Sequence, residues 1–210
     1  MTNHHPNPRG LQLAELETMV RAASETRASG RGLPEQVYRA LFRDRVPSLQ
    51  DSSEIGRRKK AWLAENLDDR RLELVSRHPA PDRSVRHVFR LADGGLIESV
   101  LLWHHGQWTV CVSSQAGCAL ACRFCATGML GLSRNLEAWE IVDQVLQVGR
   151  EAGIRVGDVV FMGMGEPLMN VEEVHRAAQV MTQSLGLQIS RRRITVSTAG
   201  VVPEIHRFID

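Results

Sequence analysis

Residues 136–163, LEAWEIVDQVLQVGREAGIRVGDVVFMG, decide the fold class of this chain of 210 residues. Apolar residues recur at helical spacing in the first half of the stretch: Leu136, Trp139, Val142 and Val145. Asn135 precedes them and is the expected helix cap. GDVVFMG at 157–163 is typical of a buried strand that ends in a glycine-rich turn. A helix that leads into a buried strand predicts a βαβ unit.

The same alternation continues downstream. VEEVHRAAQVMTQSL predicts a second helix, with Asn170 as its cap and Glu173 completing a capping box. RITVS at 193–197 predicts another strand. Strands separated by helices of 13–15 residues form parallel sheets, so the fold class is α/β.

The upstream half has a different pattern. Residues 11–75 are expected to be helical, in three segments: one from Leu11, one opened by Pro34, and one from about Ser53. After these segments, the spacing of the apolar residues shifts toward every second residue. HVFRL (87–91), IESVLLW (97–103) and WTVCVSS (108–114), separated by the turns ADGG and HHGQ, predict a β-meander.

Composition narrows the functional class. The chain is 43% hydrophobic and 24% charged, with a net charge of +2, as in an ordinary globular protein. It has no apolar run long enough to cross a membrane, and MTNHHPNPRG at the start is not a secretory signal. Three of its four cysteines fall in one cluster, which indicates a reducing, cytoplasmic location rather than a disulfide framework.

Two short segments concentrate positive charge: GRRKKAW at 56–62 and SRRRIT at 190–195. Each has two interpretations. The first is a solvated helix face and a solvated strand entrance. The second is contact with the phosphates of a nucleic acid.

The clustered cysteines lie in GCALACRFCATG at 117–128, where Cys118, Cys122 and Cys125 have the spacing C-x3-C-x2-C. Zinc normally takes four ligands, usually as two separated pairs. Cys111 or the histidines at 104 and 105 are possible fourth ligands. An iron–sulfur cluster fits three close thiolates better, because a [4Fe–4S] cluster with three protein ligands leaves one iron open for a substrate or cofactor.

These residues resemble the radical S-adenosylmethionine (SAM) superfamily. In that superfamily the open iron binds the amino and carboxylate groups of SAM, and an electron from the cluster cleaves SAM to a 5′-deoxyadenosyl radical. GMGEP at 163–167 is similar to the superfamily's motif for the SAM amino group. The resemblance implies an incomplete TIM-like barrel, with a helical module and a short meander before it.

A closer resemblance is to the RlmN/Cfr family of RNA adenine methyltransferases, and it covers most of 97–203. It rests on the segments CVSSQAGCALACRFCATG, LSRNL, FMGMGEPL and RRITVSTAGVVP. The helical front resembles the family's RNA-contacting module more loosely. The resemblance implies methylation of adenine C2 in 23S rRNA, and possibly in tRNA, with C8 methylation as in Cfr as an alternative. It also implies an electron donor such as flavodoxin.

Site residues follow by the same resemblance. The three clustered cysteines match the cluster ligands, and three residues match SAM contacts: Gly165, Glu166 and Ser197. Glu98 matches a proton-accepting carboxylate, although by itself it is typical of an exposed strand residue. Cys111 matches the cysteine that resolves a covalent RNA adduct, although by itself it is typical of a small buried residue.

The family pattern continues beyond Asp210 with a Ser-Leu-His SAM contact, an asparagine and a methyl-carrying cysteine. The expectation is therefore a fragment of a longer enzyme or a truncated gene product. Two other hypotheses stay open: a different radical SAM enzyme, and an RNA-binding remnant without activity. The expected domains are a helical module (1–80), a β-meander (81–108) and the first half of the barrel (109–210).

Overall fold

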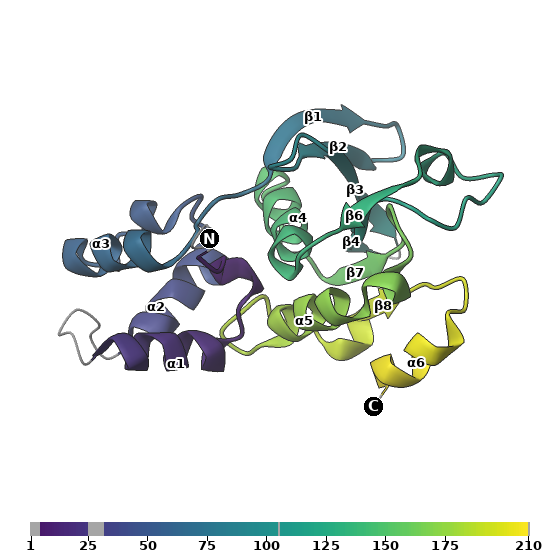
Figure 1. Cartoon of the computed structure of the whole chain (residues 1–210). Helices are drawn as coiled ribbons and strands as arrows, with labels where there is room; N and C mark the ends of the chain where they lie inside the picture. Colours follow the sequence, from purple (N-terminus) through teal and green to yellow (C-terminus); the bar gives the residue numbers. More distant parts are fainter. Residues whose placement is uncertain (1–4, 25–31, 105, 210) are drawn as a thin grey trace.

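A mixed sheet of six strands organises the computed structural model, which describes residues 5–24, 32–104 and 106–209 (Figure 1). The strand order is β1-β2-β3-β4-β7-β8. The strands are β1 (Glu73–Pro79), β2 (Val85–Arg90), β3 (Leu96–His104), β4 (Gln107–Cys111), β7 (Asp158–Phe161) and β8 (Ile194–Val196). A second sheet pairs β5 (Gln115–Gly117) with β6 (Leu132–Asn135).

The direction of pairing changes at β4. The first four strands pair antiparallel through successive hairpins, and then β4–β7 and β7–β8 pair in parallel. The parallel half confirms the βαβ units expected from the sequence. The chain is therefore an α/β protein with a partial barrel-like sheet.

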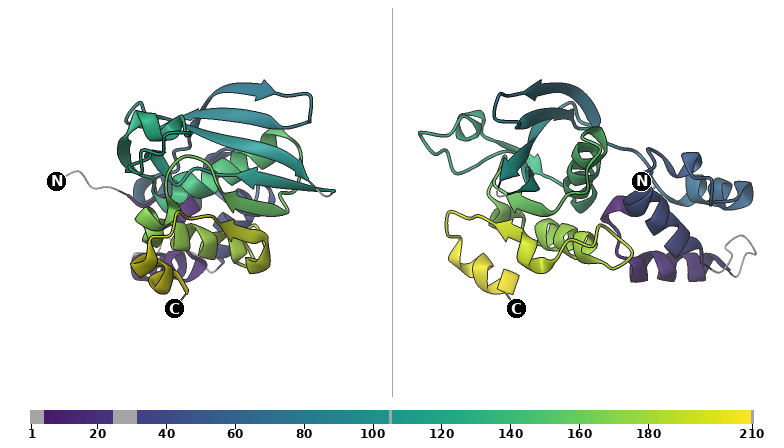
Figure 2. Two further views of the ribbon diagram at one scale, coloured as in Figure 1. Left: turned by 90° about the vertical axis from the view of Figure 1, so that its right-hand side faces the viewer. Right: turned by 180° about the vertical axis from the view of Figure 1, so that it is seen from behind.

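Two long helices connect the parallel strands. α4 (Ala138–Glu151) leads into β7, and α5 (Val171–Thr182) leads from β7 to β8. They lie on the side of the sheet away from the projecting β5–β6 arm (Figures 1 and 2). The sheet residues that face them are fully buried and apolar, among them Ile97, Val110 and Val159. Burying this apolar area is the main stabilisation of the two layers.

The remaining helices are α1 (Leu13–Ser24), α2 (Leu33–Tyr38), α3 (Arg57–Asn66) and α6 (Val202–Ile209). A π-helical turn, Arg39–Arg43, continues α2. Short 3-10 turns complete the helical structure: Pro8–Gly10, Leu49–Asp51, Thr127–Leu130, Pro167–Asn170 and Arg191–Arg193. Within the described ranges, no helix is long and apolar enough to cross a membrane.

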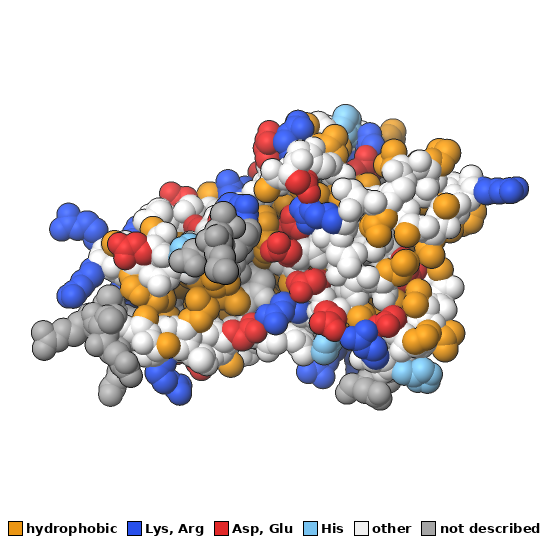
Figure 3. Space-filling model, viewed as in Figure 1, with side chains coloured by type: hydrophobic (Ala, Val, Ile, Leu, Met, Phe, Trp, Pro, Cys, Tyr) orange, Lys and Arg blue, Asp and Glu red, His pale blue; other side chains and the backbone are white. Residues whose placement is uncertain are grey.

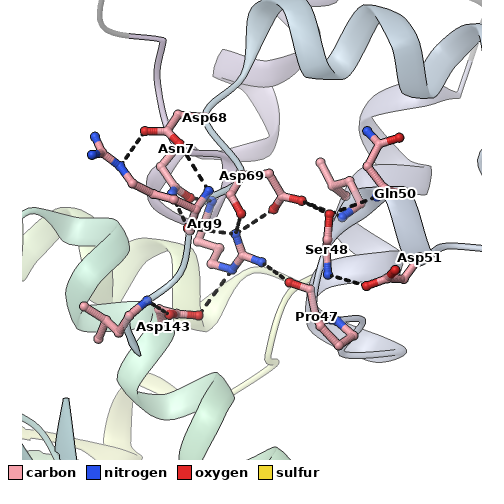
Figure 4. A network of polar contacts seen from close by, with 12 residues as sticks. Asn7, Arg9, Pro47, Ser48, Gln50, Asp51, Asp68, Asp69 and Asp143 are labelled. Carbon is pink, nitrogen blue, oxygen red and sulfur yellow. Dashed lines mark hydrogen bonds and ion pairs between the residues drawn. The ribbon is translucent and has the colours of Figure 1, made fainter. Parts of the chain in front are cut away.

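A buried arginine joins the helical part to the sheet (Figure 4). The Arg9 side chain is only 2% exposed; its guanidinium lies 2.7 Å from the Asp69 carboxylate and 3.3 Å from that of Asp143 on α4. It also donates to the Pro47 carbonyl. Burial raises the pKa of the Asp143 carboxyl, and the charge of Arg9 opposes that shift. The N-terminal segment, the α3–β1 connection and α4 therefore meet at one guanidinium.

Of the two predicted helix caps, Asn135 is wrong, and Asn170 is the N-cap of α5 but without a side-chain cap bond. Glu137 is the N-cap of α4, in a capping box with Glu140. Asn135 belongs to β6, where its side chain accepts from Gln115 and donates to the Met169 carbonyl. Both asparagine side chains bond to other loops instead of to helix ends.

At the start of α5, Asn170 occupies the N-cap position but makes no side-chain cap bond. Its amide donates to the Ser114 and Leu136 carbonyls, at 2.8 Å each. Glu173 accepts from the backbone of Ala138 instead of completing a capping box. These two side chains therefore tie α5 to α4 and to the segment after β4.

The helical expectation for 11–75 runs too far, because Glu73–Pro79 is strand β1 and pairs with β2. The third helix begins at Arg57 rather than near Ser53, after a 3-10 turn that Ser48 caps. The β5–β6 arm was not predicted. The division of the chain at residues 80 and 108 stays a prediction, and the sheet continues across both positions.

Replacing Arg9 by alanine tests the buried junction. We expect Arg9→Ala to lower the free energy of unfolding by about 3–5 kcal/mol, because the Asp143 carboxylate loses its buried partner. Urea denaturation followed by circular dichroism measures the change.

The matched control is Arg77→Ala. Arg77 pairs at 3.5 Å with Glu151, and its side chain is 44% exposed, so the expected loss is below about 1 kcal/mol. Equal losses for the two variants would contradict the role of Arg9.

Candidate functional site

The loops that follow β4, β7 and β8 come together at the carboxyl ends of the parallel strands. The backbone N–H of Gly163 donates to the Val112 carbonyl at 3.1 Å, and that of Ser114 donates to the Met164 carbonyl at 2.9 Å. Binding sites of parallel α/β sheets lie at this end of the strands. The predicted glycine-rich turn therefore lies directly against the segment that leads to the cysteines.

Two glycines allow this contact. A Cβ atom at Gly163 would lie 2.7 Å from the Val112 carbonyl oxygen. Gly165 has a φ of +98°, and a Cβ there would lie 2.5 Å from the Gln115 Cβ. A side chain at either position would push the turn away from the β4–β5 segment. The two glycines of GMGEP are therefore required here by close packing, whatever ligand the turn contacts.

The three clustered cysteines lie on the loop between β5 and β6, which projects as an arm from the sheet (Figure 1). The N–H of Cys118 donates to the Gly131 carbonyl at 2.9 Å, and the N–H of Cys125 donates to the Cys122 carbonyl at 3.0 Å. A Cβ at Gly117, which has a φ of +83°, would lie 1.9 Å from the Gly131 carbonyl oxygen. The loop is therefore folded tightly at its base.

All three thiols are free, with Cys118 buried and the other two partly exposed. Among the described residues, no three histidine, cysteine, aspartate or glutamate side chains converge where a single metal ion could sit. A [4Fe–4S] cluster binds each thiolate through a different iron, so its ligands need not converge on one point. Three unpaired thiols on one loop fit that donor set.

Apolar side chains surround the thiols and point outward. Phe124 is 94% exposed, and Met129 and Leu130 are almost as open. Figure 3 shows apolar side chains gathered over this part of the molecule. Exposed apolar groups of this size mark a contact surface.

Arg134 fixes the base of the arm. Its guanidinium binds both oxygens of Glu140 on α4 at 2.7 Å and donates to Asp93 at 2.5 Å. The hydrogen bonds to Glu140 raise the pKa of Arg134 above its ordinary value. A bidentate arginine–carboxylate pair fixes orientation as well as distance, so the cysteine loop is anchored to the helix layer.

Glu166 joins three loops. Its side chain is buried; one oxygen accepts from the Leu168 N–H at 3.0 Å and the other from the Ala199 N–H at 2.8 Å. The Glu166 N–H donates to the Gln115 side chain, which in turn donates to Asn135. The turn after β7 is thereby tied to the loop after β8 and to the cysteine arm.

Gln144 of α4 holds the segment after β4 against strand β3. Its side-chain oxygen accepts from the Ser99 hydroxyl at 2.6 Å and from the Ser113 N–H at 2.8 Å. The Ser113 hydroxyl donates to the Glu98 carbonyl and accepts from the Met164 N–H. The sequence analysis did not single out these residues, because nothing in their local pattern distinguishes them from ordinary polar side chains.

Glu98 and Cys111 lie on the face of the sheet opposite to the helices. Val100 is the strand partner of Cys111, and Glu98 precedes Val100 by two residues, so all three share that face. Glu98 is half exposed and pairs with Arg86 at 2.6 Å. Cys111 is buried, which raises the pKa of its thiol, against the opposing effect of the Met162 N–H. The structure thus brings both residues to one face.

Ser197 is exposed directly after β8, at the same strand ends as Gly165. The two histidines considered as zinc ligands give no information, because residue 105 and the side chain of residue 104 lie outside the described residues. The loops after β4, β7 and β8 therefore hold all the predicted cluster and SAM residues.

The sequence pattern of the Radical SAM superfamily matches residues 112–210. Residues 112–210 therefore form a domain of this superfamily. The match starts at the end of β4 and includes the cysteine arm, the glycine-rich turn and β8. A crystal structure of a radical SAM methyltransferase from Sphaerobacter thermophilus superposes with a TM-score of 0.88 at 38% identity, over 96% of this chain and 59% of that one.

Relatives of known name agree with this assignment. A probable dual-specificity RNA methyltransferase RlmN from Aquifex aeolicus is 43% identical over 82% of this chain and 50% of its own length. An RlmN from Syntrophobacter fumaroxidans is also 43% identical, over 93% of this chain and 57% of its own length. The chain therefore spans about half the length of the curated relatives it matches.

The link through Glu166 in the radical SAM domain can be tested without any ligand. We expect Glu166→Gln to speed hydrogen exchange of the Ala199 amide by roughly 10- to 100-fold, because that N–H loses a charge-assisted bond worth about 1.5–3 kcal/mol. NMR or mass-spectrometric exchange measures it.

Glu172→Gln is the control, since that side chain is 77% exposed and, among the described residues, pairs with Arg207 at the surface. It should leave exchange at Ala199 unchanged. Unaltered exchange in Glu166→Gln would show that the carboxylate does not hold the two loops together.

Proposed function

We propose that residues 1–210 form the cofactor-binding part of an RlmN-type RNA methyltransferase that modifies C2 of an adenine in 23S rRNA and in tRNA. The observation that carries the proposal is that the glycine-rich turn packs against the segment that leads to three unpaired thiols, within a radical SAM domain. The names of the relatives support RNA as the substrate.

Cys118, Cys122 and Cys125 would hold a [4Fe–4S] cluster, with one iron left open for SAM. When bound, the cluster supplies the electron that cleaves SAM and so provides a radical able to attack an unactivated carbon. The exposed apolar side chains around the thiols would exclude water from the reacting groups once a bound partner covers them. An external electron donor such as flavodoxin would reduce the cluster.

Gly165, Glu166 and Ser197 would contact SAM. Each Glu166 oxygen already accepts one backbone N–H, and a carboxylate oxygen has a second acceptor site. Glu166 can therefore receive the SAM ammonium while keeping its two loops together. Gly165 lets a ligand approach the backbone closely, and the exposed Ser197 supplies a hydroxyl.

Glu98 and Cys111 would act on the RNA from the open face of the sheet. Glu98 would take a proton from the modified adenine, with Arg86 orienting its carboxylate. Cys111 would release the RNA by bonding through its sulfur to the sulfur of a methyl-carrying cysteine. The bond from that second sulfur to the RNA-bound carbon would break, and its electron pair would stay with the carbon, which takes up a proton and becomes the methyl group. Burial raises the pKa of the Cys111 thiol, which favours the protonated form over the more nucleophilic thiolate.

Metal uptake is the first test. Reconstituted without oxygen, the chain should bind about four irons and show thiolate-to-iron charge-transfer absorption. Cys118→Ala should abolish the uptake, while Cys111→Ala, which removes a thiol outside the ligand set, should leave it intact. Stoichiometric zinc binding without iron uptake would refute the cluster.

The methylation itself needs a methyl-carrying cysteine, and all four cysteines of residues 1–210 already have a proposed role. Residues 1–210 alone are thus expected not to methylate RNA. A chimera that adds the C-terminal half of the Aquifex aeolicus relative should place a labelled methyl group on adenine C2. Mass spectrometry of digested RNA distinguishes C2 from C8.

In that chimera, Cys111→Ala should accumulate a protein–RNA adduct on denaturing gels, because nothing resolves the covalent bond. Multiple turnover by Cys111→Ala would refute its role. Methyladenosine made by residues 1–210 without the added half would refute the need for a carrier cysteine.

A further inference from the structure

A cavity of about 390 Å³ lies between the helical part and the parallel strands. Its walls come from the π-helical turn, from the α4–β7 connection and from the α5–β8 loop at 184–188. Figures 1 and 2 both place that last loop beside the N-terminal helices. The two connections precede β7 and β8, so the cavity lies at the amino ends of the strands, away from the cysteines.

Four arginines line this cavity: Arg39, Arg43, Arg45 and Arg155. The described residues that line it include no aspartate or glutamate. Arg39 is balanced by Glu54 at 3.2 Å, outside the lining. The other three form no ion pair within the described part of the chain; Arg155 donates to the Gln188 amide oxygen.

Like charges are close together in this cavity. The pKa of Arg45 is lowered, first by burial and then by the charge of Arg155. Repulsion between two guanidiniums with no carboxylate nearby is unfavourable, and a bound anion would relieve it.

The backbone at Arg45 points to a role for its side chain. Arg45 follows the π-helical turn with a φ of +53°, and the next N–H, that of Val46, bonds back to the Ala40 carbonyl at 2.9 Å. Glycine is the favoured residue at such a helix end. An arginine here carries a conformational cost, and one of its N–H groups donates to the Ile154 carbonyl across the cavity wall. A guanidinium has five N–H donors, so others remain for a ligand.

We propose that Arg43, Arg45 and Arg155 form a binding site for a phosphate group at the amino ends of the strands. Guanidiniums bind phosphate through paired N–H donors. The phosphate could belong to an RNA backbone, an assignment that rests on the proposed function, or to a free phosphate compound. The cavity beside α5 and α6 is less suited, because Glu172 and Glu173 accompany its arginines.

The experiment uses the whole chain and two probes, inorganic phosphate and a tRNA transcript. Phosphate is titrated while the arginine side-chain N–H signals are followed by NMR, and RNA affinity is measured by anisotropy between 50 and 200 mM salt. Saturable phosphate shifts should occur in the parent chain and be lost in the Arg43→Gln, Arg155→Gln double variant. RNA affinity of that variant should fall roughly 10-fold, and the salt slope should drop by about two, one for each lost contact.

Arg83→Gln is the matched control, because Arg83 is an exposed arginine of the β1–β2 turn outside the cavity. Arg155→Lys should retain part of the RNA affinity that the double variant loses, since lysine keeps the positive charge but lacks the paired N–H donors of arginine. Circular dichroism checks that each variant is folded.

Phosphate binding lost in the double variant with RNA affinity unchanged would support the site and assign it to a free phosphate compound. Phosphate shifts that are absent, or that persist in the double variant, would overturn the site. Iron uptake and adenine methylation are independent of these measurements, so a failure here is distinguishable from a failure of the proposed function.

Discussion

The contact between Arg9 and Asp143 is the constraint on which the arrangement of the chain depends. A guanidinium buried this far from water is tolerated only where carboxylates and carbonyls surround it, and Asp69, Asp143 and the Pro47 carbonyl meet that need. Asp143 belongs to α4, and its neighbour Gln144 points to the sheet, where it holds Ser113. The helix that receives the N-terminal segment therefore also positions the turn at the site.

Because α4 contacts both the N-terminal segment and the sheet, the sequence predicted the helix but not the contacts of its polar side chains. Its apolar spacing was sufficient to predict the helix. The same spacing implies a polar face in water, whereas Glu140, Asp143, Gln144 and Gln147 are all buried. The last three have partners tens of residues away along the chain, as with Leu72 for Asp143, and no local pattern encodes such pairing. The predicted cap at Asn135 and the expected side-chain cap bond of Asn170 failed for the same reason.

Some parts of the candidate site are likewise encoded in short stretches of sequence, whereas others depend on contacts between distant segments. The cysteine spacing and the glycine-rich turn are contained within a few residues each, so the sequence alone predicted them. The link from Gln115 through Glu166 to Ala199 joins three loops that are far apart in sequence. The resemblance predicts that Glu166 contacts SAM, and the structure adds that its carboxylate holds two loops. A single carboxylate can do both because it has more acceptor sites than the backbone uses.

Among the described residues, few buried polar side-chain atoms lack a hydrogen-bond partner. Within the described residues, three buried side-chain atoms lack a hydrogen-bond partner: Glu35 Oε2, His87 Nε2 and Ser114 Oγ. Ser114 lies directly beneath the glycine-rich turn, whose Met164 carbonyl accepts its N–H. A sequence that fits its fold satisfies buried polar groups and balances its charges, and departures concentrate where ligands bind. The hydroxyl under the turn and the unbalanced arginines at the other end of the strands are two such departures. Each leaves a polar or charged group that a ligand can satisfy.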